Sequence, residues 1–231
     1  MKKIGLIGGM GPESTLDYYK SIIDSFKTGE GELSYPEIFI YSINLSEFLN
    51  LMKAREYDKI VPLLSGKIEA LAKAGADFAA ITANTPHMFY DAVAAKSPVP
   101  MISIVEATCR ETVRRGLKRP GLFGTGFTMA SDFYQKVFDR VQIPIVLPDL
   151  DEMEILNQKL FGEIEQGIFR EDTRNLLIEI IKRMVQEEKI DSLILGCTEF
   201  PLILTAPEYA GIPMLNTTQI HVDAIVKECR S

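Results

Sequence analysis

The sequence predicts an α/β protein built from two similar halves, each a mostly parallel sheet flanked by helices. Short apolar runs of strand length alternate with longer amphipathic segments, which is typical of parallel sheets. Three motifs also recur in the same order, at offsets of 116, 115 and 114 residues: GLIGGMG (5–11) with GLFGTGF (121–127), DYY (17–19) with DFY (132–134), and DFAAITANT (77–85) with DSLILGCTE (191–199). We therefore expect one domain of residues 1–100 plus a terminal helix at 216–231, and a second domain of residues 101–215.

The first half begins with IGLIGG (4–9), an apolar run closed by glycines that predicts a buried parallel strand. Pro12 and Glu13 suit the first turn of a helix that continues over 16–26. Gly75 suits the C-terminal cap of a long helix that starts near Glu56. The other elements expected here are strands at 35–43 and 77–82 and a helix that begins over 84–87.

The second half repeats this alternation. A helix is predicted at 128–140, with Thr128 as its N-cap. The other predicted helices cover 104–116, 151–166, 171–188 and 216–229, and one more follows Cys197, interrupted by Pro201 and Pro207. The predicted strands cover 119–125, 143–148 and 192–195. Ligands of such sheets bind beyond the carboxyl ends of the strands, so the matching turns are expected to face one cleft between the halves.

Composition and charge limit the classes of function. The 231 residues carry a net charge of −7 and show no basic stripe, which argues against a nucleic-acid partner. The three cysteines form no CxxC pair, so a reduced, cytoplasmic protein without disulfides is expected. No apolar run reaches the length of a membrane span or a signal peptide, so no membrane association is expected. A small molecule is the partner that remains.

Cys197 lies at the end of a predicted strand, after Gly196 and before the polar pair Thr198 and Glu199. A cysteine at a helix N-terminus would have a lowered pKa, and its thiolate could act as a nucleophile or a base. The alternative is a buried structural cysteine. The repeat places Ala83 at the equivalent position of the first half.

The two matched turns, 83–85 and 198–199, are candidate anion sites, because backbone N–H groups at helix starts bind carboxylates. Each is otherwise a simple helix start. The loop at 8–11 does not satisfy GxGxxG, so we expect it to bind a small ligand rather than a nucleotide. The Gly124-Thr125 turn is its counterpart in the second half.

The histidines and the other cysteines have weaker signals. His87 is either a hydrolase-style partner of Cys197 or a polar residue on a helix face, whereas His221 is expected to stabilise the terminal helix. Neither histidine has metal-ligand spacing, so no metal site is predicted. Cys109 and Cys229 lie in amphipathic segments and are expected to be fillers.

Four motifs, IGLIGGMGPESTLDYY (4–19), ANTPH (83–87), GTGFTMASDFY (124–134) and LGCTEFP (195–201), together resemble the aspartate/glutamate racemase family, in its amino-acid racemase branch. The resemblance covers nearly the whole chain. It implies two pseudo-symmetric α/β domains, a homodimer, and racemisation of an amino acid without pyridoxal phosphate, a metal or any other cofactor.

Racemisation needs one group to remove the α-proton and another to return a proton on the opposite face. In typical members of the family both groups are cysteines. Cys197 matches the second cysteine, and the resemblance gives it an acid/base role. Ala83, which has no ionisable group, occupies the position of the first cysteine. Some members carry threonine there, and in this chain Thr82 is one residue earlier.

The resemblance also implies residues that bind the substrate: Met10, Gly11, Met52, Asn84, Thr85, Thr125, Thr198 and Glu199. No basic residue is clearly placed to pair with an acidic side chain of a substrate. Two alternatives to a racemase follow from Ala83. One is a single-cysteine decarboxylase or isomerase of small carboxylic acids, and the other is a non-catalytic amino-acid-binding protein.

Overall fold

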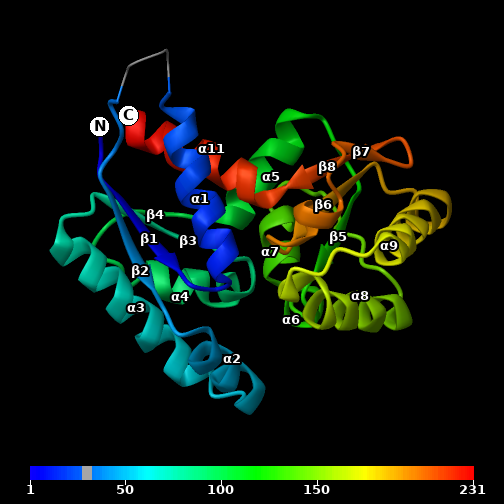
Figure 1. Ribbon diagram of the computed structural model, residues 1–231, viewed down its shortest axis with the longest axis horizontal. Coiled ribbons are helices and arrows are strands. Elements are labelled where there is room, and N and C mark those ends of the chain that lie inside the picture. Colours follow the sequence, from blue (N-terminus) through cyan, green and yellow to red (C-terminus); the bar gives the residue numbers. More distant parts are fainter. Residues whose placement is uncertain (28–32) are drawn as a thin grey trace. The chain divides into compact units, whose positions relative to one another are not determined.

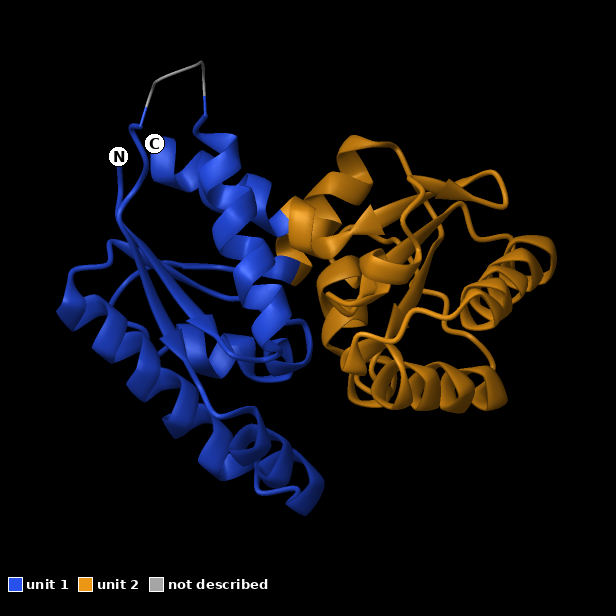
Figure 2. Ribbon diagram, in the orientation of Figure 1, with its two compact units in different colours: residues 1–104, 221–231 blue, residues 105–220 orange. Residues whose placement is uncertain are grey.

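The computed structural model describes residues 1–27 and 33–231, which form two compact units (Figures 1 and 2). Unit 1 contains residues 1–104 and 221–231, and unit 2 contains residues 105–220. Each unit contains a mostly parallel sheet with helices packed against it. The predicted fold class is therefore confirmed. No helix within the described ranges is both long and apolar enough to cross a membrane.

The sheet of unit 1 has the strand order β2-β1-β3-β4, and every neighbouring pair is parallel. Its central strands, β1 and β3, are buried at every residue, as expected for parallel strands covered on both faces. The strands are β1 (Ile4–Gly8), β2 (Ile38–Ser42), β3 (Phe78–Ile81) and β4 (Met101–Ile102). The sequence analysis did not predict β4, which has only two residues.

Helices cover both faces of this sheet. Ile4 and Leu6 of β1 pack with Tyr18 of α1 and Val222 of α11 in one core cluster. On the other face, a Cβ at Gly5 would lie 3.3 Å from Leu71 Cβ, so the glycine lets α3 pack closely. The helical segments are α1 (Pro12–Ser25), α2 (Leu45–Ala54), α3 (Tyr57–Ala74), η1 (Thr85–Phe89), α4 (Tyr90–Ala94) and α11 (Thr217–Arg230).

The sheet of unit 2 has the order β5-β6-β8-β7, in which only the β7–β8 pair is antiparallel. The predicted strand at 143–148 is wrong, since it is reduced to one parallel bridge between Val146 and Gly121. Pro144 and Pro148 remove the N–H groups that a longer ladder needs. The strands are β5 (Pro120–Gly124), β6 (Ser192–Gly196), β7 (Glu208–Tyr209) and β8 (Ile212–Asn216), of which β7 and β8 were not predicted.

The helices of unit 2 include a second correction. The predicted helix at 128–140 is divided into α6 and α7, and its N-cap is Thr125, whose Oγ1 accepts the Thr128 N–H at 3.1 Å. Ser131 donates its hydroxyl to the Phe127 carbonyl, a local bond that competes with helix continuation. The segments are α5 (Ile104–Arg114), α6 (Gly126–Met129), α7 (Phe133–Asp139), α8 (Leu150–Gly162), η2 (Ile164–Gln166), α9 (Glu171–Arg183), η3 (Met184–Glu188) and α10 (Phe200–Ile203).

The aspartates of the sequence repeat have the same structural role in each unit. Asp77 accepts a hydrogen bond from the Lys3 N–H at 2.7 Å, and Asp191 accepts one from the Lys118 N–H at 2.5 Å. Each carboxylate thus fixes the chain entering the neighbouring strand. This part of the repeat is therefore architectural.

The repeated glycines that end β1 and β5 also have one cause. A Cβ at Gly8 would lie 2.5 Å from Thr15 Cγ2, and a Cβ at Gly124 would lie 2.8 Å from Thr128 Cγ2. Only glycine leaves room for the threonine of the following helix. The turns after these strands are consequently tight, and this is where the candidate site residues lie.

Candidate functional site

The turn after β6 holds the thiol that the sequence singles out. A Cβ at Gly196 would lie 2.7 Å from Leu122 Cδ1, so the strand end packs closely on β5. Cys197 follows it and is 7% exposed. Its Sγ donates to Glu199 Oε2 at 2.9 Å, and Thr198 Oγ1 donates to the same oxygen at 2.9 Å. Cys197, Thr198 and Glu199 thus form one hydrogen-bonded group.

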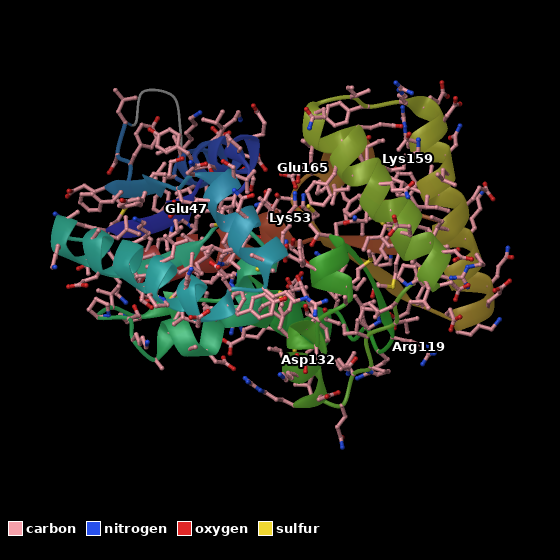
Figure 3. The ribbon with its side chains drawn as sticks, turned by 90° about the horizontal axis from the view of Figure 1, so that it is seen from below. Glu47, Lys53, Arg119, Asp132, Lys159 and Glu165 are labelled. Atoms are coloured by element: carbon pink, nitrogen blue, oxygen red, sulfur yellow. The ribbon has the colours of Figure 1, made fainter. Side chains whose placement is uncertain are left out.

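Glu165 joins this group from a different element. It lies on η2, which follows α8, and Figure 3 labels its side chain. The donor atoms of Glu165, Cys197 and Glu199 lie within 4.8 Å of one another. Burial, followed by the charge of Glu199, raises the pKa of Glu165 to about 7. The sequence analysis missed this residue, because nothing in its local pattern indicates contact with the Cys197 turn.

The prediction of a lowered pKa for Cys197 is wrong. Burial raises the pKa of the thiol well above its usual value, and the charges of Glu199 and Glu165 add to the effect. The expected helix N-terminus contributes little, since α10 has only four residues and begins at Phe200. Cys197 is therefore a neutral thiol at rest, hydrogen-bonded to a carboxylate.

The same three groups could also hold a cation. A thiolate with two carboxylates is a ligand set that suits zinc, although binding would require the thiol to lose its proton. Two of the ligands are adjacent in the chain, but the third lies on η2. The metal-ligand spacing used in the sequence analysis does not detect such a set.

The matching turn of unit 1 follows β3. Ala83 is 6% exposed, and Asn84 and Thr85 lead into η1. Thr82 is fully buried, and its hydroxyl donates to the Ile7 carbonyl at 3.1 Å. The Thr82 carbonyl accepts from Ser14 Oγ at 3.1 Å. Thr82 therefore ties β3 to β1 and α1.

The remaining predicted binding residues are divided between the units. Met10 and Gly11 follow β1, which pairs with β3, so they belong to the same sheet edge as Ala83. Thr125 follows β5, which pairs with β6, and lies at the edge that carries Cys197. Met52 is 1% exposed on α2 and is a core residue of unit 1.

His87 is committed within unit 1. Its Nδ1 donates to the Ala83 carbonyl at 2.8 Å, and its Nε2 accepts the Ile104 N–H at 3.2 Å, which assigns the neutral tautomer. Burial lowers its pKa to about 4. Both ring nitrogens are used, so none remains for a hydrolase-style bond to Cys197.

His221 stabilises the terminal helix, as predicted. Its Nδ1 accepts from the Tyr18 hydroxyl at 2.8 Å, and its Nε2 donates to the Ile102 carbonyl at 3.0 Å. These bonds join α11 to α1 and to β4. The ring is fully buried and belongs to the core of unit 1.

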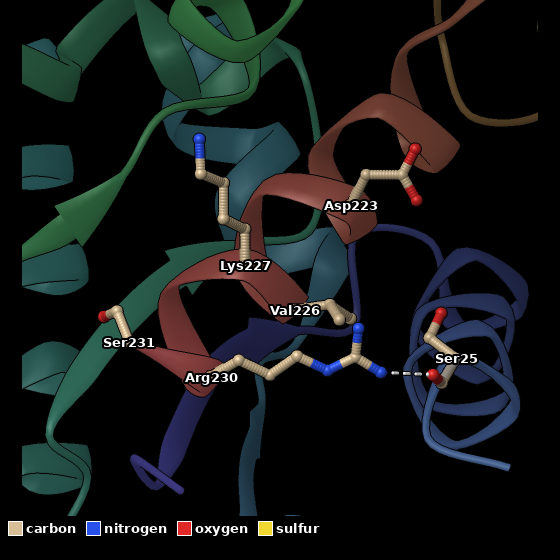
Figure 4. Close-up of a pocket in the computed structure, with 6 residues that line it drawn as sticks. All are labelled: Ser25, Asp223, Val226, Lys227, Arg230 and Ser231. Atoms are coloured by element: carbon tan, nitrogen blue, oxygen red, sulfur yellow. Dashed lines mark hydrogen bonds between the residues drawn. The ribbon is translucent and has the colours of Figure 1, made fainter. Parts of the chain in front are cut away.

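A surface pocket lies elsewhere on unit 1, beside the end of α11 (Figure 4). Arg230 borders it and donates to the Ser25 carbonyl at 2.7 Å. The pocket is lined by Ser25, Asp223, Val226, Lys227, Arg230 and Ser231. It contains no thiol and no residue of the repeated turns, so the Cys197 turn is the better candidate site.

Comparison with known proteins gives one consistent result. The family model for Asp/Glu/hydantoin racemases matches residues 7–225. The chain is 28% identical over 218 residues to the broad specificity amino-acid racemase RacX of Bacillus subtilis, covering 93% of this chain and 92% of that protein.

Solved structures agree. An aspartate racemase homologue from Pyrococcus horikoshii matches with a TM-score of 0.87 at 35% identity, and a putative Asp/Glu racemase from Yersinia pestis matches with a TM-score of 0.91 at 31% identity. Both matches cover 100% of each chain.

Proposed function

Because this chain belongs to the Asp/Glu/hydantoin racemase family, we propose that it is a cofactor-independent amino-acid racemase with Cys197 as one acid/base group. The observation that carries the proposal is the Cys197 thiol at the carboxyl end of β6, 2.9 Å from the Glu199 carboxylate. Relatives named as amino-acid racemases support the substrate class.

The carboxyl groups give Cys197 a way to change its protonation state. Glu199 accepts the S–H bond and is the natural recipient of the thiol proton. An α-ammonium group bound beside Glu199 and Glu165 would offset their charge and lower the pKa of the thiol. The thiolate then removes the α-proton, a task for which a strong base is suited. Binding of substrate thus activates the base.

The developing negative charge on the substrate needs hydrogen-bond donors. In the proposed site these are the backbone N–H groups and hydroxyls of the turns that follow the strands, at Thr198 and at Asn84–Thr85. Donors at such turns stabilise a carboxylate and the enolate-like state derived from it.

The second proton transfer is the distinctive feature of this chain. Ala83 has no acidic proton, and Thr82 already donates its hydroxyl to Ile7. We therefore assign the returning proton to a water molecule beside Ala83. A homodimer in the cytoplasm is part of the same proposal, and light scattering checks the number of subunits.

Ala83 also favours a second candidate function, a single-cysteine enzyme acting on one face of a small carboxylic acid. In that case, α-proton exchange proceeds without loss of configuration. A third candidate, an amino-acid-binding protein without catalysis, would show ligand-induced thermal stabilisation and no exchange.

One experiment separates these functions. Purified protein is incubated in deuterated water with single enantiomers of amino acids, and α-deuteration and enantiomer composition are followed by NMR and chiral chromatography. A racemase gives both, and Cys197→Ala abolishes both. Cys109→Ala is the matched control, because Cys109 is a buried free cysteine outside the site.

The outcome that refutes the proposal is an absence of α-deuteration with every amino acid. Ala83→Cys tests the two-base requirement. Racemisation that appears only in this variant would show that the native chain is not a working two-base racemase.

A further inference from the structure

The Cys197 thiol is surrounded by two carboxyl groups without a compensating cation. The donor atoms of Glu165, Cys197 and Glu199 lie within 4.8 Å of one another. In the described part of the chain, no lysine or arginine forms an ion pair with either carboxyl group. The cations on α8 and α9 are used elsewhere: Lys159 pairs with Glu163, and Arg183 pairs with Glu152. The site therefore presents uncompensated negative charge to a ligand.

The two carboxyl groups differ in their contacts. Glu199 is 5% exposed, and its Oε2 accepts from both the Cys197 thiol and Thr198 Oγ1. It is fixed against the acid/base group. Glu165 is only partly buried and comes from a separate element, η2. Within the described residues it makes no side-chain hydrogen bond, so its carboxyl group is available to a ligand.

Family membership independently indicates what the ligand carries. An amino acid brings an α-ammonium group, which compensates one carboxylate and leaves the other unmatched. An acidic side chain would add a third negative charge within a few ångströms, where repulsion is strong in a partly desolvated site. A basic side chain instead supplies the missing positive charge.

We propose that Glu199 receives the α-ammonium group of the substrate and that Glu165 selects an amino acid with a basic side chain, such as lysine, ornithine or arginine. Aspartate and glutamate are poor substrates for the same reason. The inference rests on the proposed function and specifies its substrate class.

The first test compares L-lysine, L-norleucine and L-glutamate with the wild-type protein. Norleucine has the same carbon chain as lysine without the ammonium group. We expect kcat/KM for α-proton exchange to be about tenfold or more higher for lysine than for norleucine, and lower still for glutamate. Norleucine or glutamate reacting as fast as lysine would overturn the inference.

The second test uses Glu165→Gln. We expect the advantage of lysine over norleucine to disappear, mainly through a higher KM for lysine, while norleucine changes by less than about twofold. Glu179→Gln is the matched control, because Glu179 is exposed and pairs only with Lys182. An unchanged lysine-to-norleucine ratio in Glu165→Gln refutes the role of this residue.

Thermal unfolding establishes that each variant is folded, and if Glu165→Gln is not, the wild-type ratio alone decides. Failure of this inference and failure of the proposed function have different signatures. Exchange of norleucine or glutamate without a preference for lysine overturns only the assignment of the substrate class. A lack of exchange with every amino acid overturns both.

Discussion

Replacing Glu165 by glutamine should remove a pH-dependent cost to stability. The pKa of this carboxyl group is raised to about 7 in the folded protein from 4.5. A group with a raised pKa contributes stability that is fully present below the unfolded value and is lost as the pH rises through the folded value. The wild-type protein should therefore lose stability between about pH 4.5 and pH 7, whereas Glu165→Gln should lack this part of the loss.

The magnitude follows from the shift. A difference of 2.5 pKa units at about 1.4 kcal/mol per unit gives an upper figure of about 3 kcal/mol. Because the side chain is only partly buried, solvent screening reduces this to about 2 kcal/mol. In a protein of this size the corresponding change in Tm is about 4–8 °C.

The assay is urea denaturation of both proteins at pH 5, 6, 7 and 8. Other groups titrate alike in the two proteins, so the difference between them isolates Glu165. We expect Glu165→Gln to gain about 2 kcal/mol relative to wild type between pH 5 and pH 8, while Glu179→Gln gains nothing. A wild-type-to-variant difference that stays constant across this range would refute the assigned environment of Glu165.

Two further predictions concern the thiol and the strand ends. Cys197 should react with iodoacetamide more slowly than a free thiol at pH 8, and Glu199→Gln should accelerate the reaction several-fold by lowering the thiol pKa. Peptide mass spectrometry measures the rate, and an unchanged rate contradicts the prediction. Gly124→Ala should cost about 1–3 kcal/mol in urea denaturation, because its Cβ would lie 2.8 Å from Thr128 Cγ2. Gly162→Ala, where nothing lies within 4 Å, should cost nothing.

Most of the architecture could be predicted from local pattern. The apolar runs of β1, β3, β5 and β6 are continuous, and a continuous apolar run between turn residues is a strong signal of a buried strand. The errors lie where that signal is weak. The segment at 143–148 is interrupted by prolines, and β4 and β7 have two residues each.

The candidate site was only partly predictable. Cys197 and its turn follow from the repeat, but Glu165 lies on η2 and reaches the thiol only through the packing of unit 2. The same holds for Thr82, whose hydroxyl faces β1 rather than a ligand.

The sequence by itself determined the two-part α/β fold, the family, and the position of one thiol at a strand end, because these depend on the order and polarity of neighbouring residues. Only the tertiary structure decided the chemical state of that thiol. Burial and the convergence of Glu165 and Glu199 raise its pKa, reversing the direction expected from a helix N-terminus. Desolvation and charge act through space, so residues distant in the chain set the reactivity of Cys197.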